Sequence, residues 1–258
     1  MPANADLAAS LALLGSIAVA LAAYGLRRAF RGRVDYDRVR QQGGTIFLGN
    51  GIMTAGYWLL QPAVRWCVGA GIQPAVLTWL SLAPAAAATV AAARGVWGLA
   101  AWGLFLSSLL DVLDGAVARA GGSASKRGAI LDSTLDRYAE FMFFAGVLVC
   151  WRHSVGLQLL CFAAVAGSVL VTYSTAKAEA LGLTPPRGLM KRSDRMACLI
   201  AGSALSPLLV RWSGPAGQPW PAVAAVGLIA VLGNLSAIQR FRALAREAAS
   251  GASPRSRG

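Results

Sequence analysis

The sequence predicts an all-α protein, a polytopic bundle of membrane helices, and two observations lead to this fold class. First, 56% of the 258 residues are hydrophobic and only 14% are charged, which exceeds the apolar content that a water-soluble domain of this size needs. Second, the apolar residues gather in stretches of about 20, the length that an α-helix needs to cross a bilayer. We therefore expect a multi-pass membrane protein.

The first apolar stretch, Leu7–Leu26, carries no charge and is long enough to span a membrane. A cleaved signal peptide is the alternative, but residues 1–6 lack the positive charge that such a peptide carries before its apolar region. We therefore expect a retained N-terminal transmembrane helix with a basic flank, together forming a first region at residues 1–33. The basic residues of the flank are Arg27, Arg28, Arg31 and Arg33.

The second region, residues 34–73, is expected to contain a polar linker and an amphipathic helix. The stretch Ile52–Gly69 is apolar, but Arg65 interrupts it and Trp58 and Trp66 bracket that arginine. Tryptophan favours the boundary between membrane and water, and a charged residue disfavours the bilayer interior. This helix is therefore expected to lie in the interface rather than to cross it.

Six further apolar stretches predict a six-helix membrane domain at residues 74–241. The stretches are Pro74–Ala93, Val96–Ala118, Ala129–Cys150, Val155–Ala176, Met196–Val210 and Pro221–Ile238. The remaining residues, 242–258, are rich in Ala, Ser, Gly and Arg and predict a basic, disordered tail.

Positive charge is distributed unequally between the two sides of the predicted bundle. Alternate crossing places Arg94, Arg152 and Arg211 on one side and a larger basic set on the other. The positive-inside rule makes the richer side cytoplasmic, so we expect a multi-pass protein of the cell inner membrane. Because these residues flank apolar segments and form no continuous patch, nucleic acid is not an expected partner despite the net charge of +13. The richer side carries Arg119, Lys126, Arg127, Lys177, Arg187, Lys191, Arg192, Arg195, Arg240, Arg242 and Arg246.

Four of the eleven acidic residues fall inside or at the ends of these apolar segments: Asp111, Asp114, Asp132 and Asp136. A carboxylate in the middle of a bilayer costs about 3 kcal/mol on insertion scales, so a group of four requires a partner or a function. Spacings of three and four residues place each pair on one face of its helix, and a short connection would bring the two faces together. We expect all four to meet in a cavity that opens to the cytoplasm.

Carboxylates without histidine or thiolate neighbours suit hard cations, Mg²⁺ or Mn²⁺, and four of them can hold a pair of ions as in two-metal phosphoryl-transfer sites. Gly115, Ala118 and Gly128 lie on the same faces and leave room for a ligand near the backbone. Arg119 offers a guanidinium to a phosphate group. Two other interpretations remain open: buried ion pairs with neighbouring basic residues, and an ion path through a proton- or ion-coupled transporter.

The complete pattern, D-x-x-D-G-x-x-A-R-x8-G-x-x-x-D-x-x-x-D, resembles the signature of the CDP-alcohol phosphotransferases, and every fixed position matches. The resemblance implies a six-helix body preceded by an interfacial helix, a homodimer, an active site near the cytoplasmic face and dependence on Mg²⁺ or Mn²⁺. It also implies transfer of a phosphatidyl group from CDP-diacylglycerol to a polar alcohol, with release of CMP.

The same resemblance implies residue roles. Asp111, Asp114 and Asp132 are expected to bind metal, and Asp136 to be both a ligand and the general base. The CDP group is expected to lie near Gly115, Ala118, Arg119, Gly128 and Thr78. A carboxylate beside the attacking hydroxyl can take its proton, and metal-bound pyrophosphate is a good leaving group, so these roles are chemically coherent.

The acceptor is the least determined part of the sequence prediction. The stretch 131–137 and the later Lys191-Arg-Ser-Asp-Arg195 resemble the subgroup that uses inositol 1-phosphate. That resemblance makes Lys177, Arg192 and Arg195 the candidate acceptor residues. Thr175 stands where the subgroup commonly has a lysine, so glycerol 3-phosphate, serine or free inositol remain alternative acceptors.

Overall fold

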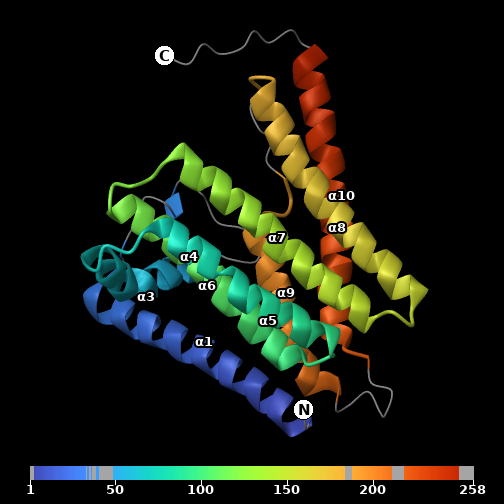
Figure 1. Ribbon diagram of the computed structural model, residues 1–258, viewed down its shortest axis with the longest axis horizontal. Helices are drawn as coiled ribbons and strands as arrows, with labels where there is room; N and C mark the ends of the chain where they lie inside the picture. Colours follow the sequence, from blue (N-terminus) through green and yellow to red (C-terminus); the bar gives the residue numbers. More distant parts are fainter. Residues whose placement is uncertain are drawn as a thin grey trace.

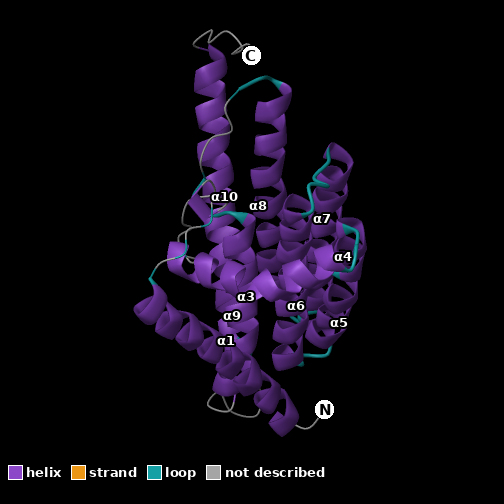
Figure 2. Ribbon diagram, turned by 90° about the vertical axis from the view of Figure 1, so that its left-hand side faces the viewer, coloured by secondary structure: helices purple, strands orange, loops and turns teal. Residues whose placement is uncertain are grey.

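The computed structural model describes residues 3–32, 34, 36, 39–40, 49–183, 188–210 and 218–249. Every regular element in these ranges is a helix, which confirms the predicted fold class (Figures 1 and 2). Several of the expected features lie outside the described residues: most of the polar linker, Arg33, Arg187, Arg211 and residues 250–258. The helices are α1 (Ala3–Arg31), α3 (Asn50–Gly69), α4 (Pro74–Leu80), α5 (Leu82–Ala93), α6 (Trp97–Ala120), α7 (Lys126–Cys150), α8 (Val155–Ala180), α9 (Arg192–Val210) and α10 (Trp220–Ala249).

Five segments of the described chain are long and apolar enough to cross a membrane, at residues 4–31, 74–93, 97–120, 155–180 and 220–249. α7 and α9 are not among them, and these two helices carry most of the charged side chains that the bundle encloses. α7 packs along α5, and α9 packs between α6 and α10. The protein is therefore a multi-pass membrane protein whose two more polar helices pack against apolar ones.

Small residues bring the helices into close contact. A Cβ at Gly103 would lie 2.6 Å from the carbonyl oxygen of Pro84, and a Cβ at Gly167 would lie 2.8 Å from the backbone nitrogen of Asn234. These positions join α6 to α5 and α8 to α10. Close backbone approach through small residues is a main source of helix association in membranes, where the hydrophobic effect does not act between helices.

α1 is attached to the start of α6. The Asp6 carboxylate accepts hydrogen bonds from the backbone nitrogens of Gly98 (2.8 Å) and Leu99 (3.3 Å), so it caps the first turn of α6. The Trp102 indole donates to the Ala9 carbonyl oxygen at 2.8 Å. Further along, Leu13 of α1 packs with Ala101 and with Ala204 of α9. The N-terminal helix is thus fixed to the outside of the bundle (Figure 1).

α3 lies at the other end of α1 and rests on α4 and α6. Its buried face packs Leu60, Val64 and Cys67 against Leu77 of α4 and Val117 of α6, while Trp66 on the opposite face is 68% exposed. α3 is not among the spans identified by length and composition. Its place at the membrane interface stays a prediction.

α10 is longer than the sequence analysis expected. It continues to Ala249, past residue 241 where the membrane domain was expected to end. The reason is that packing continues along this helix: Leu244 is buried, and the Phe241 ring lies 6.1 Å from the Tyr173 ring of α8. Residues 242–249 are therefore helical.

Candidate active site

The hairpin of α6 and α7 brings the aspartates together. Gly122 takes a positive φ of 63° in the connecting turn, and the Ser125 hydroxyl accepts a hydrogen bond from the Gly128 nitrogen at 3.1 Å, which caps α7. The last turns of α6 therefore lie beside the first turns of α7. Oxygen atoms of Asp111, Asp114 and Asp132 all lie within 4.8 Å of one another.

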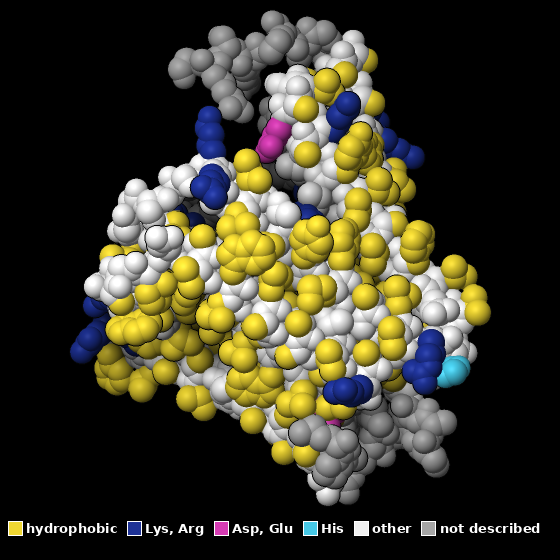
Figure 3. Space-filling model, viewed as in Figure 1, with side chains coloured by type: hydrophobic (Ala, Val, Ile, Leu, Met, Phe, Trp, Pro, Cys, Tyr) yellow, Lys and Arg dark blue, Asp and Glu magenta, His cyan; other side chains and the backbone are white. Residues whose placement is uncertain are grey.

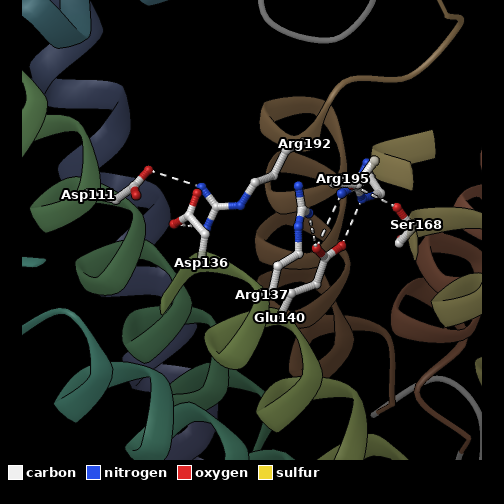
Figure 4. Close-up of polar contacts among 8 residues, drawn as sticks. Asp111, Asp136, Arg137, Glu140, Ser168, Arg192 and Arg195 are labelled. Atoms are coloured by element: carbon white, nitrogen blue, oxygen red, sulfur yellow. Dashed lines mark hydrogen bonds and ion pairs between the residues drawn. The ribbon is translucent and has the colours of Figure 1, made fainter. Parts of the chain in front are cut away.

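Asp136 lies next to this group of three and is connected to it by an arginine. The Arg192 guanidinium of α9 binds Asp111 at 3.1 Å and Asp136 at 2.6 Å, and Figure 4 shows it reaching between the two carboxylates. Asp111 is also within hydrogen-bonding reach of both Asp132 and Asp136. The structure thus brings the four aspartates together, with three in one compact cluster and the fourth beside it.

Asp114 is the most buried member of the cluster, at 4% exposure. Thr78 of α4 lies near this carboxyl group, and its hydroxyl donates to the Pro74 carbonyl oxygen at 3.1 Å. The Oδ2 atom of Asp114 has no hydrogen-bond partner within the described part of the chain. A buried carboxylate oxygen without a partner is costly, and a divalent cation would satisfy it with the hard oxygen ligands such ions prefer. The residues present therefore fit a divalent metal ion.

The small residues of the motif lie along the same hairpin. A Cβ at Gly115 would approach the Arg119 guanidinium to 3.1 Å, so the absence of a side chain there gives Arg119 room to lie back along α6. Arg119 is exposed, Ala118 is half-buried and Gly128 is exposed at the first turn of α7. These residues belong to the end of α6 and the beginning of α7, next to the carboxylate cluster in the chain.

A further acidic side chain, Glu140, is buried in the bundle, and arginines bind both of its carboxylate oxygens. The Arg195 guanidinium donates to both oxygens of Glu140, at 2.7 and 3.2 Å, and Arg137 donates to Glu140 at 3.2 Å. Glu140 and Arg195 are each almost inaccessible to solvent. Figure 4 shows this group directly beside the Asp111–Arg192–Asp136 bridge. Arg195, expected from the sequence to contact the acceptor, is thus held in place by Glu140.

A cavity of about 200 Å³ adjoins these arginines. Its polar lining is mostly cationic, and its residues are Arg137, Val171, Thr172, Thr175, Lys191, Arg192, Arg195 and Arg240. Two of the three expected acceptor residues, Arg192 and Arg195, line it. The third, Lys177, does not line this cavity and is exposed on α8.

Arg240 is a site residue that the sequence analysis counted only as a flanking charge. Its guanidinium donates to the Thr175 hydroxyl at 2.7 Å and to the Val171 carbonyl oxygen at 3.4 Å. A guanidinium from α10 therefore lies beside the position where α8 lacks the expected lysine. No local motif marks this residue, because its contact with Thr175 spans 65 positions of the chain.

Comparison with known proteins gives consistent results. A phosphatidylinositol phosphate synthase of Mycobacteroides abscessus is 36% identical over 151 residues, which cover 57% of this chain and 64%, just under two thirds, of that relative. An archaetidylinositol phosphate synthase of Methanothermobacter thermautotrophicus is 34% identical over 165 residues, covering 64% of this chain and 78% of the relative.

The fold also matches a solved structure. The phosphatidylinositol phosphate synthase PgsA1 of Mycobacterium tuberculosis, solved with CDP-DAG bound, superposes with a TM-score of 0.61 at 27% identity, covering 70% of this chain and 90% of that one. The same protein has been solved in complex with manganese and citrate, with an equal TM-score.

The sequence profile of one family matches residues 72–234, which include α4 to α9 and the first half of α10. The matched segment contains the aspartate cluster, the paired Glu140 and the cationic cavity apart from Arg240. The chain belongs to the CDP-alcohol phosphatidyltransferase family and is a membrane-embedded transferase of phospholipid biosynthesis.

Proposed function

We propose that this enzyme transfers the phosphatidyl group of CDP-diacylglycerol to the hydroxyl of inositol 1-phosphate. In this reaction the hydroxyl oxygen forms a bond to the lipid-linked phosphorus, the bond from that phosphorus to the CMP oxygen breaks, and CMP leaves. The hydroxyl proton passes to a carboxylate of the enzyme.

The observation that carries this proposal is the position of Arg192. It binds two aspartates of the motif and also lines the cationic cavity, so the two sites share a wall. An acceptor whose phosphate group occupies the cavity would therefore place its ring hydroxyls toward Asp136. Such positioning converts an encounter between two substrates into a reaction between bound groups.

Within this arrangement Asp111, Asp114 and Asp132 would hold Mg²⁺ or Mn²⁺, and we propose a pair of ions with Asp136 as a further ligand. Bound metal would withdraw charge from the pyrophosphate and stabilise CMP as the leaving group. Asp136 accepts the proton of the attacking hydroxyl, and Arg192 holds its carboxylate in one orientation. Thr78, Gly115, Ala118, Arg119 and Gly128 would surround the CDP group.

The cavity favours an acceptor with a phosphomonoester. Among the basic side chains that line it, Arg137 and Arg195 pair with Glu140, and Arg192 pairs with Asp111 and Asp136. The Arg240 guanidinium donates only to the neutral oxygens of Thr175 and Val171 within the described part of the chain, so it leaves an excess positive charge. Serine and free inositol carry no phosphate to balance this excess. Arg240 supplies a cation beside Thr175, so the missing lysine no longer argues against inositol 1-phosphate. Glycerol 3-phosphate shares the phosphate and is the closest competitor.

Several further expectations belong to the same proposal. We propose that residues 74–241 form the catalytic membrane domain, with residues 1–33 and 34–73 as an added N-terminal helix and an interfacial region. We propose a homodimer in the cell inner membrane with the active site facing the cytoplasm. The excess of basic residues on one side of the predicted membrane crossings supports this orientation.

Purified protein incubated with CDP-diacylglycerol, Mn²⁺ and one acceptor at a time tests the proposal. We expect CMP release with inositol 1-phosphate to exceed release with glycerol 3-phosphate, serine or inositol by at least about tenfold in kcat/KM, the value of one good charge-assisted contact. Preference for another acceptor would reassign the cavity. Absence of CMP release with every acceptor would contradict the proposed reaction.

A further inference from the structure

A second cavity lies far along the chain from the catalytic motif, where the end of α1 meets α3. Its volume is about 390 Å³. The lining combines two arginines with aromatic and apolar side chains, and its residues are Arg27, Val34, Tyr36, Trp58, Leu59, Gln61, Pro62 and Arg65. All of them precede residue 72, where the family match begins. The family match therefore does not extend to this cavity.

Arg27 is the central polar group of the cavity. Its guanidinium lies 5.8 Å from the centre of the Trp58 ring, which fixes it against an aromatic face. Its Nη1 atom is buried, and within the described part of the chain it has no hydrogen-bond partner. A buried cationic donor of this kind is costly without an acceptor, and an anion is the ligand that would satisfy both its charge and its hydrogen bond.

The other polar groups of the cavity are also donors. Arg65 presents a second guanidinium. Burial raises the pKa of the Tyr36 phenol above its ordinary value, so this hydroxyl stays protonated at neutral pH and can donate. Two cations and a phenol around one space match an oxyanion with several acceptor atoms, such as a phosphate group.

The remaining walls indicate what the phosphate is attached to. Leu59 and Pro62 give the cavity an apolar side, and Leu59 is 48% exposed. α1 is itself a candidate membrane span, so its last turns lie where a bilayer meets water. Figure 3 shows basic side chains beside apolar ones at the end of the molecule where α1 and α3 meet. A ligand with a phosphate and adjoining acyl chains fits both walls.

α3 presents one set of residues to this cavity and another set to α4 and α6. Trp58, Gln61, Pro62 and Arg65 face the cavity, whereas Leu60, Val64 and Cys67 pack toward α4 and α6. The periodicity of an α-helix separates these two sets onto different faces. An occupant of the cavity would therefore contact the helix that supports α6 without entering the catalytic site.

We propose that the α1–α3 cavity binds the phosphate group of an anionic phospholipid, which clamps α1 to α3. This site is separate from the substrate sites proposed above and does not depend on them. The occupant is a bilayer lipid, held by Arg27, Arg65 and Tyr36 through its phosphate and by Leu59 and Pro62 through its first acyl carbons.

Native mass spectrometry of the full-length protein, released from detergent and titrated with phosphatidylglycerol or phosphatidylcholine, tests this proposal. We expect preferential binding of phosphatidylglycerol by the wild type. The double variant Arg27→Gln/Arg65→Gln should bind it about tenfold more weakly or worse, as expected for the loss of charge-assisted contacts. Arg28→Gln is the matched control, because Arg28 is at the same end of α1 but does not line the cavity.

Three outcomes would overturn the proposal. Equal loss in Arg28→Gln would mean a diffuse surface attraction, and equal binding by the double variant would mean a site elsewhere. Displacement of the lipid by millimolar inorganic phosphate alone would identify a free anion rather than a lipid as the occupant. Arg27→Lys keeps the charge but not the planar guanidinium, and should retain the protein's fold with an intermediate affinity.

Discussion

Two acidic side chains in this protein are almost equally buried and have opposite surroundings. Glu140 is 2% exposed, and both of its oxygens accept hydrogen bonds from arginines. Asp114 is 4% exposed, and its Oδ2 atom has no partner in the described part of the chain. Burial alone therefore does not reveal the role of a carboxylate here, whereas the state of its hydrogen bonds does.

The difference has a physical explanation. Charges removed from water are tolerated when partners of opposite charge and good geometry replace the lost hydration. Glu140 has these partners permanently, so it holds Arg195 and Arg137 in position. Asp114 instead lies near two carboxylates of its own sign, Asp111 and Asp132, and a cation bound among the three would satisfy its unpaired oxygen. The first carboxylate is satisfied within the chain, whereas the second keeps an acceptor atom for a ligand, which fits the metal-binding role proposed above.

Replacing Asp114 by Asn tests the chemical side of this comparison most strongly. We expect CMP release to fall by about 10⁴-fold, because metal-ion charge stabilisation contributes several kcal/mol to the barrier. Mn²⁺ binding by calorimetry should be lost while the helical circular dichroism is kept. A chelator should inactivate the wild type in the same way, with recovery on adding Mn²⁺. Normal turnover in the variant would show that the unpaired oxygen does not bind metal.

The variant Asp136→Asn tests the residue that we propose as general base and as a further metal ligand. Asp136 lies beside the cluster of three, bound to Arg192 at 2.6 Å. We expect turnover to fall by about 10³-fold, within the range attributed to general bases, while CDP-diacylglycerol binding is largely kept. Binding is measured by titration with the intact CDP-lipid, and turnover by CMP release. Near-normal turnover would remove Asp136 from the role of base.

Glu140→Gln tests the architectural side. The change leaves the buried Arg195 without its counter-charge, which should lower the free energy of unfolding by about 3–5 kcal/mol. Unfolding in denaturant reports this loss, and Glu179→Gln on the exposed part of α8 is the matched control. A double replacement, Glu140→Leu with Arg195→Met, should recover much of the stability but not the activity. Equal stability of Glu140→Gln and the control would show that the pair is not structural.

The same comparison shows what could be predicted from sequence. The aspartate spacing and the apolar stretches depend on local periodicity, and the predicted helices and the meeting of the four aspartates agree with the structure. The cationic cavity depends on contacts between distant helices. Glu140 and Arg195 are 55 positions apart, and Arg240 and Thr175 are 65 apart, so no periodicity connects them. Lys177 belongs to the same motif but does not line this cavity, so its contact with the acceptor stays a prediction.

The smallest predicted effect concerns acceptor recognition. Arg240→Gln removes one of the cavity's cations without touching the aspartates, so the KM for inositol 1-phosphate should rise about tenfold while that for CDP-diacylglycerol stays within about twofold. Lys177→Gln, at an exposed position on α8, should change neither. Kinetics with each substrate varied separately measure both values. A larger effect of Lys177→Gln than of Arg240→Gln would mean that the acceptor's phosphate binds near Lys177, as the motif suggested, and not in the cationic cavity.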